Sequence, residues 1–389
     1  MRVHLDSLET FNRIGTDGAT EAADALSMLT GVDTYVETTK INFAPVETLS
    51  TLFGGSETAV GIEFEGPLEG HAVLVFDEES AEYVLSRLAG DGPTPGEESL
   101  HEVANIMTSN FVDGWAAHLE DTIDIATPTG LDTVPGRTEH PELDEFSFVF
   151  QSDIGIGKST MGCRFYLLPE PTSFMKTLRE TGEQSGEDAV DVDELSTFIR
   201  LTAAGAETVA TNLEMMTGIE TDVAVSHLDF IPVEDVPGVV DSEQHVGSVF
   251  QFSGAIDGYL AVLFEDDAAT SMASSLAGGD LADEAMRQSA IEEIGNVTAS
   301  GFIDGWANAL DTTIDHTVPD FVDDMARAVL ESIAAELGMS QEFAYVFDVA
   351  ITTEEPMSCR VFAFPDADGF RELVSRLDAD LDVSSVERV

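Results

Sequence analysis

A carboxylate and an amide stand three residues apart at two places in the chain, Glu102 with Asn105 and Glu293 with Asn296. An amide can hold a water molecule well, because its carbonyl accepts a hydrogen bond while its NH2 group donates elsewhere, and it adds no charge. The 24-residue segments around the two pairs are identical at 12 positions: HEVANIMTSNFVDGWAAHLEDTID (101–124) and EEIGNVTASGFIDGWANALDTTID (292–315). A short motif that occurs twice in one chain is more informative than the same motif found once.

Both segments have the spacing of a helix with a polar stripe opposite an apolar face. At about 100° per residue, the apolar face of the first holds Leu100, Val103, Met107 and Phe111, and its stripe holds Glu98, Glu102, Asn105 and Ser109. The corresponding sets of the second are Ile291, Ile294 and Phe302, and Ser289, Glu293, Asn296 and Ser300. We expect the stripes to face solvent, and the aromatic residues on or beside the apolar faces to pack in a core: Phe111, Trp115, Phe302 and Trp306. An acid and an amide on the exposed face of a helix are also ordinary, so spacing alone leaves their function open.

The repetition extends over most of the chain. MLTGVDTYVETTKINFAPVE (28–47) matches MMTGIETDVAVSHLDFIPVE (215–234), and GHAVLVFDEES (70–80) matches GYLAVLFEDDA (258–268). The period of roughly 190 residues is domain-sized, which predicts a tandem domain duplication rather than a solenoid. The predicted organisation is a first domain over 1–180, a polar linker over 181–193 and a second domain over 194–389.

Each half mixes helical and strand patterns without regular βαβ alternation, which predicts the α+β class. In the first half we expect helices over 5–30, ending at Gly31, over 78–89, ending at Gly90, and from about Glu97 to Leu100 onward. Alternating runs predict strands over 39–46, 59–66, 71–77, 146–154 and 161–168. The second half repeats this order. We therefore expect two pseudo-symmetric units, each with an antiparallel sheet packed against long helices that carry the motif.

The charge of the chain is extreme, with 75 acidic against 16 basic residues and a formal net charge of −59. Self-repulsion on this scale opposes a compact fold in dilute buffer, whereas molar salt shortens the Debye length to about 3 Å and screens it. This balance is typical of a protein from a halophile that accumulates salt, such as a haloarchaeon. It argues against binding to nucleic acid or to anionic membrane surfaces, because no basic patch is available to displace counterions.

Other site chemistries find little support in the sequence. Cys163 and Cys359 lie at the same position of the two repeats, in MGCRFYLLP and MSCRVFAFP, and are expected to be buried thiols in a reducing cytoplasm. HEVAN (101–105) begins like a zinc-protease motif but lacks the second histidine, so no metal site is expected. No apolar run of 18 residues and no signal peptide is found, so a cytoplasmic protein without membrane insertion is expected.

The motif spacing resembles the signature of the CheC, CheX and FliY phosphatases of chemotaxis, [D/S]-x3-E-x2-N-x22-P. The second copy contains every element: Ser289, Glu293, Asn296 and Pro319. In the first copy Glu102, Asn105 and Pro128 keep the spacing, and Glu98 replaces the leading Asp or Ser. The chain thus resembles a tandem-duplicated haloarchaeal CheC.

The resemblance implies an enzyme that hydrolyses the aspartyl phosphate of the response regulator CheY. It implies that Asn105 and Asn296 orient the attacking water and that Glu102 and Glu293 dock against a cation of CheY. No cofactor of its own is implied, because magnesium is expected on the phosphorylated partner. Glu98, Ser289 and the two prolines are expected to support the motifs.

The family also carries an early motif in each unit, and here those motifs are degenerate. Glu9 and Asn12 keep the E-x2-N spacing and form a possible third site, although Leu5 and Tyr35 replace the flanking elements. In the second half, Ser196 and Ile199 replace the Glu and the Asn. Since CheC proteins also bind the receptor deamidase CheD, the alternative function is an adaptor for CheD or CheY with little or no catalysis.

Overall fold

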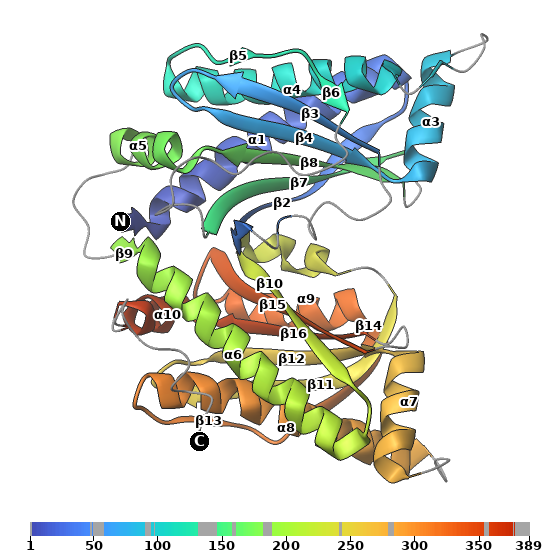
Figure 1. Cartoon of the computed structure of the whole chain (residues 1–389), viewed down its shortest axis with the longest axis vertical. Coiled ribbons are helices and arrows are strands. Elements are labelled where there is room, and N and C mark those ends of the chain that lie inside the picture. Colours follow the sequence, from blue (N-terminus) through green and yellow to red (C-terminus); the bar gives the residue numbers. More distant parts are fainter. Residues whose placement is uncertain are drawn as a thin grey trace. The chain divides into compact units, whose positions relative to one another are not determined.

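The chain divides into two compact units in the computed structural model (Figure 1), Val3–Glu187 and Asp188–Val389, the second together with Met1–Arg2. The residues described are 2–46, 49, 58–89, 95–96, 98–130, 146–157, 161–181, 189–240, 243–278, 284–353, 358–375 and 377. Residues 182–188 of the predicted linker therefore lie outside the described residues. The described end of that linker is a short strand followed by the first turn of a helix.

The first half of the chain contains, in order, β1 (Arg2–His4), α1 (Leu5–Thr30), β2 (Thr34–Pro45), β3 (Thr58–Glu65), β4 (Gly70–Phe76), α3 (Glu78–Ala89), α4 (Glu98–Leu119), β5 (Asp124–Ile125), β6 (Thr129–Gly130), β7 (Phe146–Ile156), β8 (Gly162–Pro169) and α5 (Pro171–Thr181). The predicted helices and strands of this half are therefore present, with ends that differ by a few residues. Helix α1 ends as predicted, because Gly31 adopts the left-handed conformation, φ 66°, and its N–H bonds to the carbonyl of Ser27. Gly90 lies outside the described residues.

The second half contains β9 (Ala189–Asp191), α6 (Val192–Thr217), β10 (Thr221–Pro232), the 3-10 helix η2 (Val233–Val239), β11 (Gln244–Gly254), β12 (Gly258–Glu265), α7 (Asp266–Ala277), α8 (Glu284–Ala309), β13 (Ile314–His316), β14 (Asp320–Met325), α9 (Ala326–Leu337), β15 (Phe343–Thr353), β16 (Ser358–Pro365) and α10 (Ala367–Val374). The sequence did not predict η2 or α9. Both pack on the sheet, because Val236 of η2 and Leu330 of α9 share an apolar core cluster with Phe362 of β16.

The two units share one sheet topology, and it confirms the predicted antiparallel α+β fold. In the first unit the strand order is β2-β7-β8-β4-β3, with β5 and β6 paired to the free edge of β3. In the second unit the order is β10-β15-β16-β12-β11, with β13 and β14 paired to β11. The registers also agree, because Phe64 faces Ile125 in the first unit as Phe252 faces His316 in the second.

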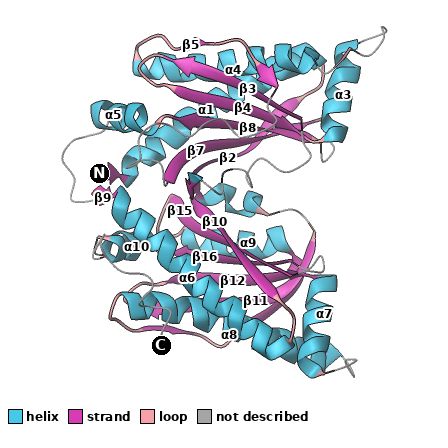
Figure 2. Ribbon diagram, in the orientation of Figure 1, coloured by secondary structure: helices cyan, strands magenta, loops and turns pink. Residues whose placement is uncertain are grey.

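A pair of long helices, α1 with α4 and α6 with α8, packs on each sheet (Figure 2). The apolar faces of α4 and α8 are buried as predicted, and Phe111, Trp115, Phe302 and Trp306 are each at most 2% exposed. Trp115 packs edge-on against Phe150, and its counterpart Trp306 donates its indole N–H to Thr202 Oγ1 at 3.1 Å. This packing fixes the rotation of each motif helix and so decides which of its faces stays in solvent.

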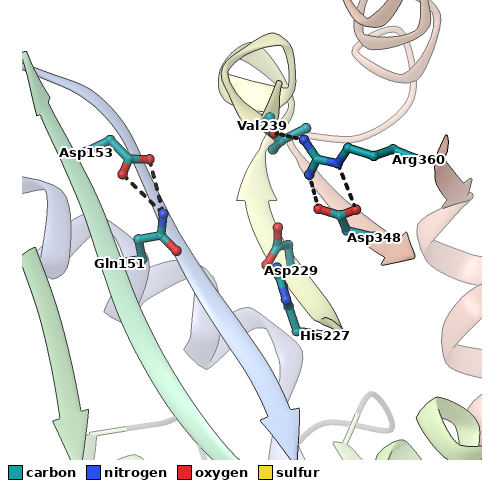
Figure 3. Close-up of polar contacts among 7 residues, drawn as sticks. All are labelled: Gln151, Asp153, His227, Asp229, Val239, Asp348 and Arg360. Carbon is teal, nitrogen blue, oxygen red and sulfur yellow. Dashed lines mark hydrogen bonds and ion pairs between the residues drawn. The ribbon is translucent and has the colours of Figure 1, made fainter. Parts of the chain in front are cut away.

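The sheet of the second unit also carries polar side chains (Figure 3), of which His227, Asp229 and Asp348 are buried. Arg360 on β16 bonds to both carboxylate oxygens of Asp348 on the neighbouring β15 and to the carbonyl of Val239 in η2. His227 Nε2 lies 3.1 Å from Asp229 Oδ1 on β10. Asp348 is buried, and a buried charge is costly unless it is paired. The half-buried Arg360 supplies this pairing and also links the sheet to η2.

Both cysteines are buried and unpaired, as predicted. Burial, together with nearby Asp153 and Asp77, raises the pKa of the Cys163 thiol, and burial alone raises the pKa of Cys359. A raised pKa keeps a thiol protonated and unreactive.

Among the helices that the structure describes, none combines the length and the apolar composition needed to cross a membrane.

The helix pairs approach each other through glycines, and this predicts different effects for two equivalent substitutions. A Cβ on Gly18 would lie 2.8 Å from the carbonyl oxygen of Phe111, whereas a Cβ on its counterpart Gly205 would lie 3.8 Å from the nearest atom, the carbonyl oxygen of Gly301. We expect Gly18→Ala to destabilise the protein by about 1–3 kcal/mol through overpacking. Gly205→Ala should be neutral or stabilise it by up to about 1 kcal/mol, because alanine favours a helix over glycine. Urea unfolding in molar KCl measures both, and equal effects would contradict this packing.

Candidate functional site

The polar stripe of α4 begins at the first residue of the helix and runs along its uncovered face. Glu98 and Glu102 are exposed, and Asn105 and Ser109 are half-buried. On α8, Ser289 and Glu293 are exposed, while Asn296 and Ser300 are half-buried. Both Glu–Asn pairs are therefore reachable from solvent, as the helical spacing predicted.

In the first unit this stripe forms one wall of a shallow groove of about 560 Å³. The helix contributes His101, Glu102 and Asn105, and the opposite wall is the segment 125–128, which ends at Pro128. Pro128 was expected to support the motif, and the structure places it in the same groove as Asn105.

The geometry explains why asparagine and proline are separated by 22 residues. From Asn105 the helix runs 14 residues to Leu119, a rise of about 21 Å. The chain then turns at Glu120, whose φ is 53°, and returns in an extended conformation through β5. About seven extended residues cover a similar length in the opposite direction. The return therefore ends beside the helical turn that holds Asn105.

The second unit repeats this construction. Asp311, the counterpart of Glu120, has a φ of 47°, and β13 returns beside α8 toward Pro319. Here a contact links the two walls, because Ser300 Oγ lies 3.1 Å from His316 Nε2. The other ring nitrogen of His316, Nδ1, lies 2.9 Å from the carbonyl oxygen of Thr317. Residue types alone did not predict this link, although the alignment of the repeats places His316 at the position of Ile125 in the first unit.

An ion-pair cluster anchors the start of α8. Arg287 donates to Asp266 Oδ1 at 2.5 Å, to Glu284 Oε1 at 3.1 Å and to Thr270 Oγ1 at 3.2 Å. Burial opposes the charge of Arg287, but its bonds to the two carboxylates outweigh burial and raise its pKa. The cluster ties α8 to α7 two residues before Ser289. The stripe of α8 therefore starts from a fixed end.

The early motif is placed differently, and this corrects the prediction of a possible third site. Asn12 is 1% exposed, and its Nδ2 donates to the carbonyl oxygen of Thr39 on β2 at 3.0 Å. Glu9 is half-buried. Because helix α1 turns Asn12 toward the sheet, its amide cannot meet a water on another protein. Ser196 and Ile199 on α6 are buried as well.

The sequence comparisons cover both segments that carry the motifs. The model of the CheC-like family matches residues 99–130 and 286–322, which hold most of each motif helix and the chain that returns beside it. The CheC1 protein of Halobacterium salinarum, to which CheY-P phosphatase activity is ascribed, is 33% identical over 195 residues, or 48% of this chain and 98% of that protein. The chain belongs to the CheC-like family. Its relative CheC1 is about half as long.

Two further comparisons cover smaller shares of the chain or of the relative. The CheY-P phosphatase CheC of Bacillus subtilis is 30% identical over 105 residues, which is 26% of this chain and about half of that relative's length. The crystal structure of FliY from Thermotoga maritima matches 44% of the chain and 93% of that structure, with 21% identity and a TM-score of 0.38. The membership in the family rests on the sequence comparisons.

Proposed function

We propose that this CheC-like protein hydrolyses the aspartyl phosphate of a CheY-type response regulator. The observation that supports this most is the Glu–Asn pair that a helix keeps reachable from solvent in both units. In the first unit the distant Pro128 lines the same groove as this pair. The two relatives that carry the name CheY-P phosphatase add support. Such an enzyme would act in the cytoplasm, where response regulators are phosphorylated.

The proposed mechanism requires little of the protein beyond positioning. An aspartyl phosphate lies in its own protein beside that protein's magnesium ion and lysine, so the phosphatase needs to hold a water in line with the phosphorus. Asn105 and Asn296 are proposed to accept a hydrogen bond from this water through the amide oxygen. The role parallels the glutamine that orients water in small GTPases.

Glu102 and Glu293 are proposed to dock the helix on CheY by pairing with a cation, for which the lysine beside the phosphorylated aspartate is the candidate. Both carboxylates lie one turn before the asparagine and are exposed. A helix can enter a partner's pocket only if its polar stripe protrudes. A stripe beside a shallow groove meets this requirement better than a stripe inside a deep cleft. The reaction would need no metal ion from the phosphatase itself.

An adaptor that binds CheD, CheY or both is the second candidate. It is favoured by the early helices, where Asn12 is buried and the equivalent positions of the second unit are Ser196 and Ile199. These half-sites have no catalytic pair to present. A protein that retains part of its motifs could bind its partners and turn over slowly.

Decay of radiolabelled CheY-phosphate in molar KCl distinguishes the two candidates. We expect a small amount of the protein to dephosphorylate a large excess of CheY-phosphate, so that each molecule turns over many times. The rate of decay should exceed the rate of spontaneous hydrolysis. An adaptor would bind phosphorylated CheY or CheD in a pull-down and leave the decay rate unchanged. That second outcome would overturn the proposed phosphatase.

A further inference from the structure

The groove of the first unit and the equivalent site of the second unit differ in which of the two elements, helix or returning strand, holds the histidine. Strand register aligns Ile125 with His316, because they pair with the equivalent residues Phe64 and Phe252. On the helix wall, the residue before the motif glutamate is His101 in the first unit and Glu292 in the second. The first unit therefore carries an imidazole on its helix and an apolar residue opposite, whereas the second carries a carboxylate on its helix and the imidazole opposite.

His101 is placed to contact whatever enters the first groove. It lines the groove together with Glu102 and Asn105, and it lies four residues before Asn105, on nearly the same side of α4. Its ring reaches across to β6, where Nε2 is 3.6 Å from the position of a Cβ on Gly130. A Cβ at this position would only make ordinary van der Waals contact with the ring, and the aligned residue of the second unit is the larger Phe321.

The equivalent site of the second unit has a carboxylate, Glu292, where the helix of the first unit has His101. Glu292 accepts a hydrogen bond from Gln288 Nε2 at 2.8 Å, so its carboxylate is held on the surface of α8. The imidazole of His316 has both nitrogens engaged, one with Ser300 and the other with the carbonyl of Thr317. A phosphoryl group that approached Asn296 would therefore meet a carboxylate where the first groove has an imidazole.

This difference matters because the substrate is an anion and the chain already carries a net charge of −59. In molar salt the long-range repulsion is screened within a few ångströms, so close contacts decide which site tolerates a phosphoryl group. An N–H donor stabilises a phosphoryl oxygen by a charge-assisted hydrogen bond, and a carboxylate at the same place repels it.

We propose that His101 is a specificity-determining residue that donates a hydrogen bond to the phosphoryl group or to the acyl oxygen of the aspartyl phosphate in the first groove. The first groove is consequently the tighter of two unequal sites. The proposal rests on the proposed function, because it assigns a role within the same site. It makes the tandem protein a phosphatase with one high-affinity and one low-affinity site.

Steady-state decay of CheY-phosphate by the full chain in molar KCl tests this, with one site silenced at a time. In an Asn296→Ala background only the first site works, and His101→Glu copies the second site into it. We expect KM to rise about tenfold, equivalent to about 1.4 kcal/mol, while kcat stays within about twofold. His101→Gln, which keeps an N–H donor, should raise KM by less. If the ellipticity of His101→Glu shows misfolding, the KM of His101→Gln tests the proposal instead.

The reciprocal change is made in an Asn105→Ala background, where only the second site works. Glu292→Gln removes the carboxylate and should lower KM about threefold or more. An unchanged KM in His101→Glu and in Glu292→Gln, with active parents, would overturn the inequality of the sites and leave the phosphatase standing. If the parents themselves fail to accelerate decay, the proposed function fails and this inference fails with it.

Discussion

Replacing Asn105 and Asn296 together by alanine should abolish the accelerated decay of CheY-phosphate, with a loss of about 100-fold or more in kcat. The amide is proposed as the group that places the water, and removal of one preorganised polar group from a reaction centre costs about 10²–10³ in rate. Each single substitution should leave the other site working. The decay of radiolabelled CheY-phosphate in molar KCl measures all three variants.

The chain provides a matched control for this experiment. Asn308 is an exposed asparagine near the end of α8, 12 residues beyond Asn296 and about 120° around the helix from it. Asn308→Ala should leave the decay rate unchanged. A double variant at Asn105 and Asn296 that folds normally and still accelerates decay would show that these amides do not carry the catalysis.

Transfer from molar KCl to about 0.1 M salt should unfold the protein. At low salt the Debye length grows from about 3 Å to about 10 Å, so the 75 acidic residues repel one another over the whole surface of each unit. We expect the far-UV ellipticity to collapse over this range, and sucrose at low salt to restore it incompletely, since sucrose does not screen charge. Full ellipticity at 0.1 M salt would contradict this effect of the charge.

Much of the fold could be predicted because local patterns and tertiary packing agree in this chain. The alternating runs became β3, β4, β7 and β8, and Gly31 ends α1 because only a residue that tolerates positive φ fits that position. Helix α9 was not predicted, because the second half was expected only to repeat the elements of the first. It follows directly on a segment that contains the acidic residues Asp323 and Asp324. Those residues belong to β14, an edge strand whose exposed face can be acidic.

The candidate site was predictable where it depends on one helix and less so where it depends on two elements. Helical spacing placed Glu102 and Asn105 on the exposed face of α4, since a single helix decides that face. The same spacing at Glu9 and Asn12 suggested a possible third site, but the orientation of α1 on the sheet buries Asn12. The place of Pro128 in the groove depends on the return of the chain through β5, which residue types alone do not reveal.

Site-directed photo-crosslinking tests most directly whether the stripes of α4 and α8 enter the phosphorylated pocket of a partner. A cysteine introduced at Glu98 or Ser289, both exposed at the start of a stripe, can be labelled with a maleimide benzophenone. Cys163 and Cys359 should not compete for the label, because burial raises the pKa of both thiols. Matched control cysteines replace Met28 and Met339, which are 80% and 75% exposed and lie off the motif helices.

The partner in this measurement is CheY held in its activated form by beryllofluoride, in molar KCl. We predict that Glu98→Cys and Ser289→Cys crosslink to activated CheY and much less to inactive CheY, while the Met28→Cys and Met339→Cys variants crosslink weakly to both. Equal crosslinking from all four positions, or crosslinking from the control positions alone, would contradict the docking of the exposed Glu–Asn stripes on the phosphorylated partner.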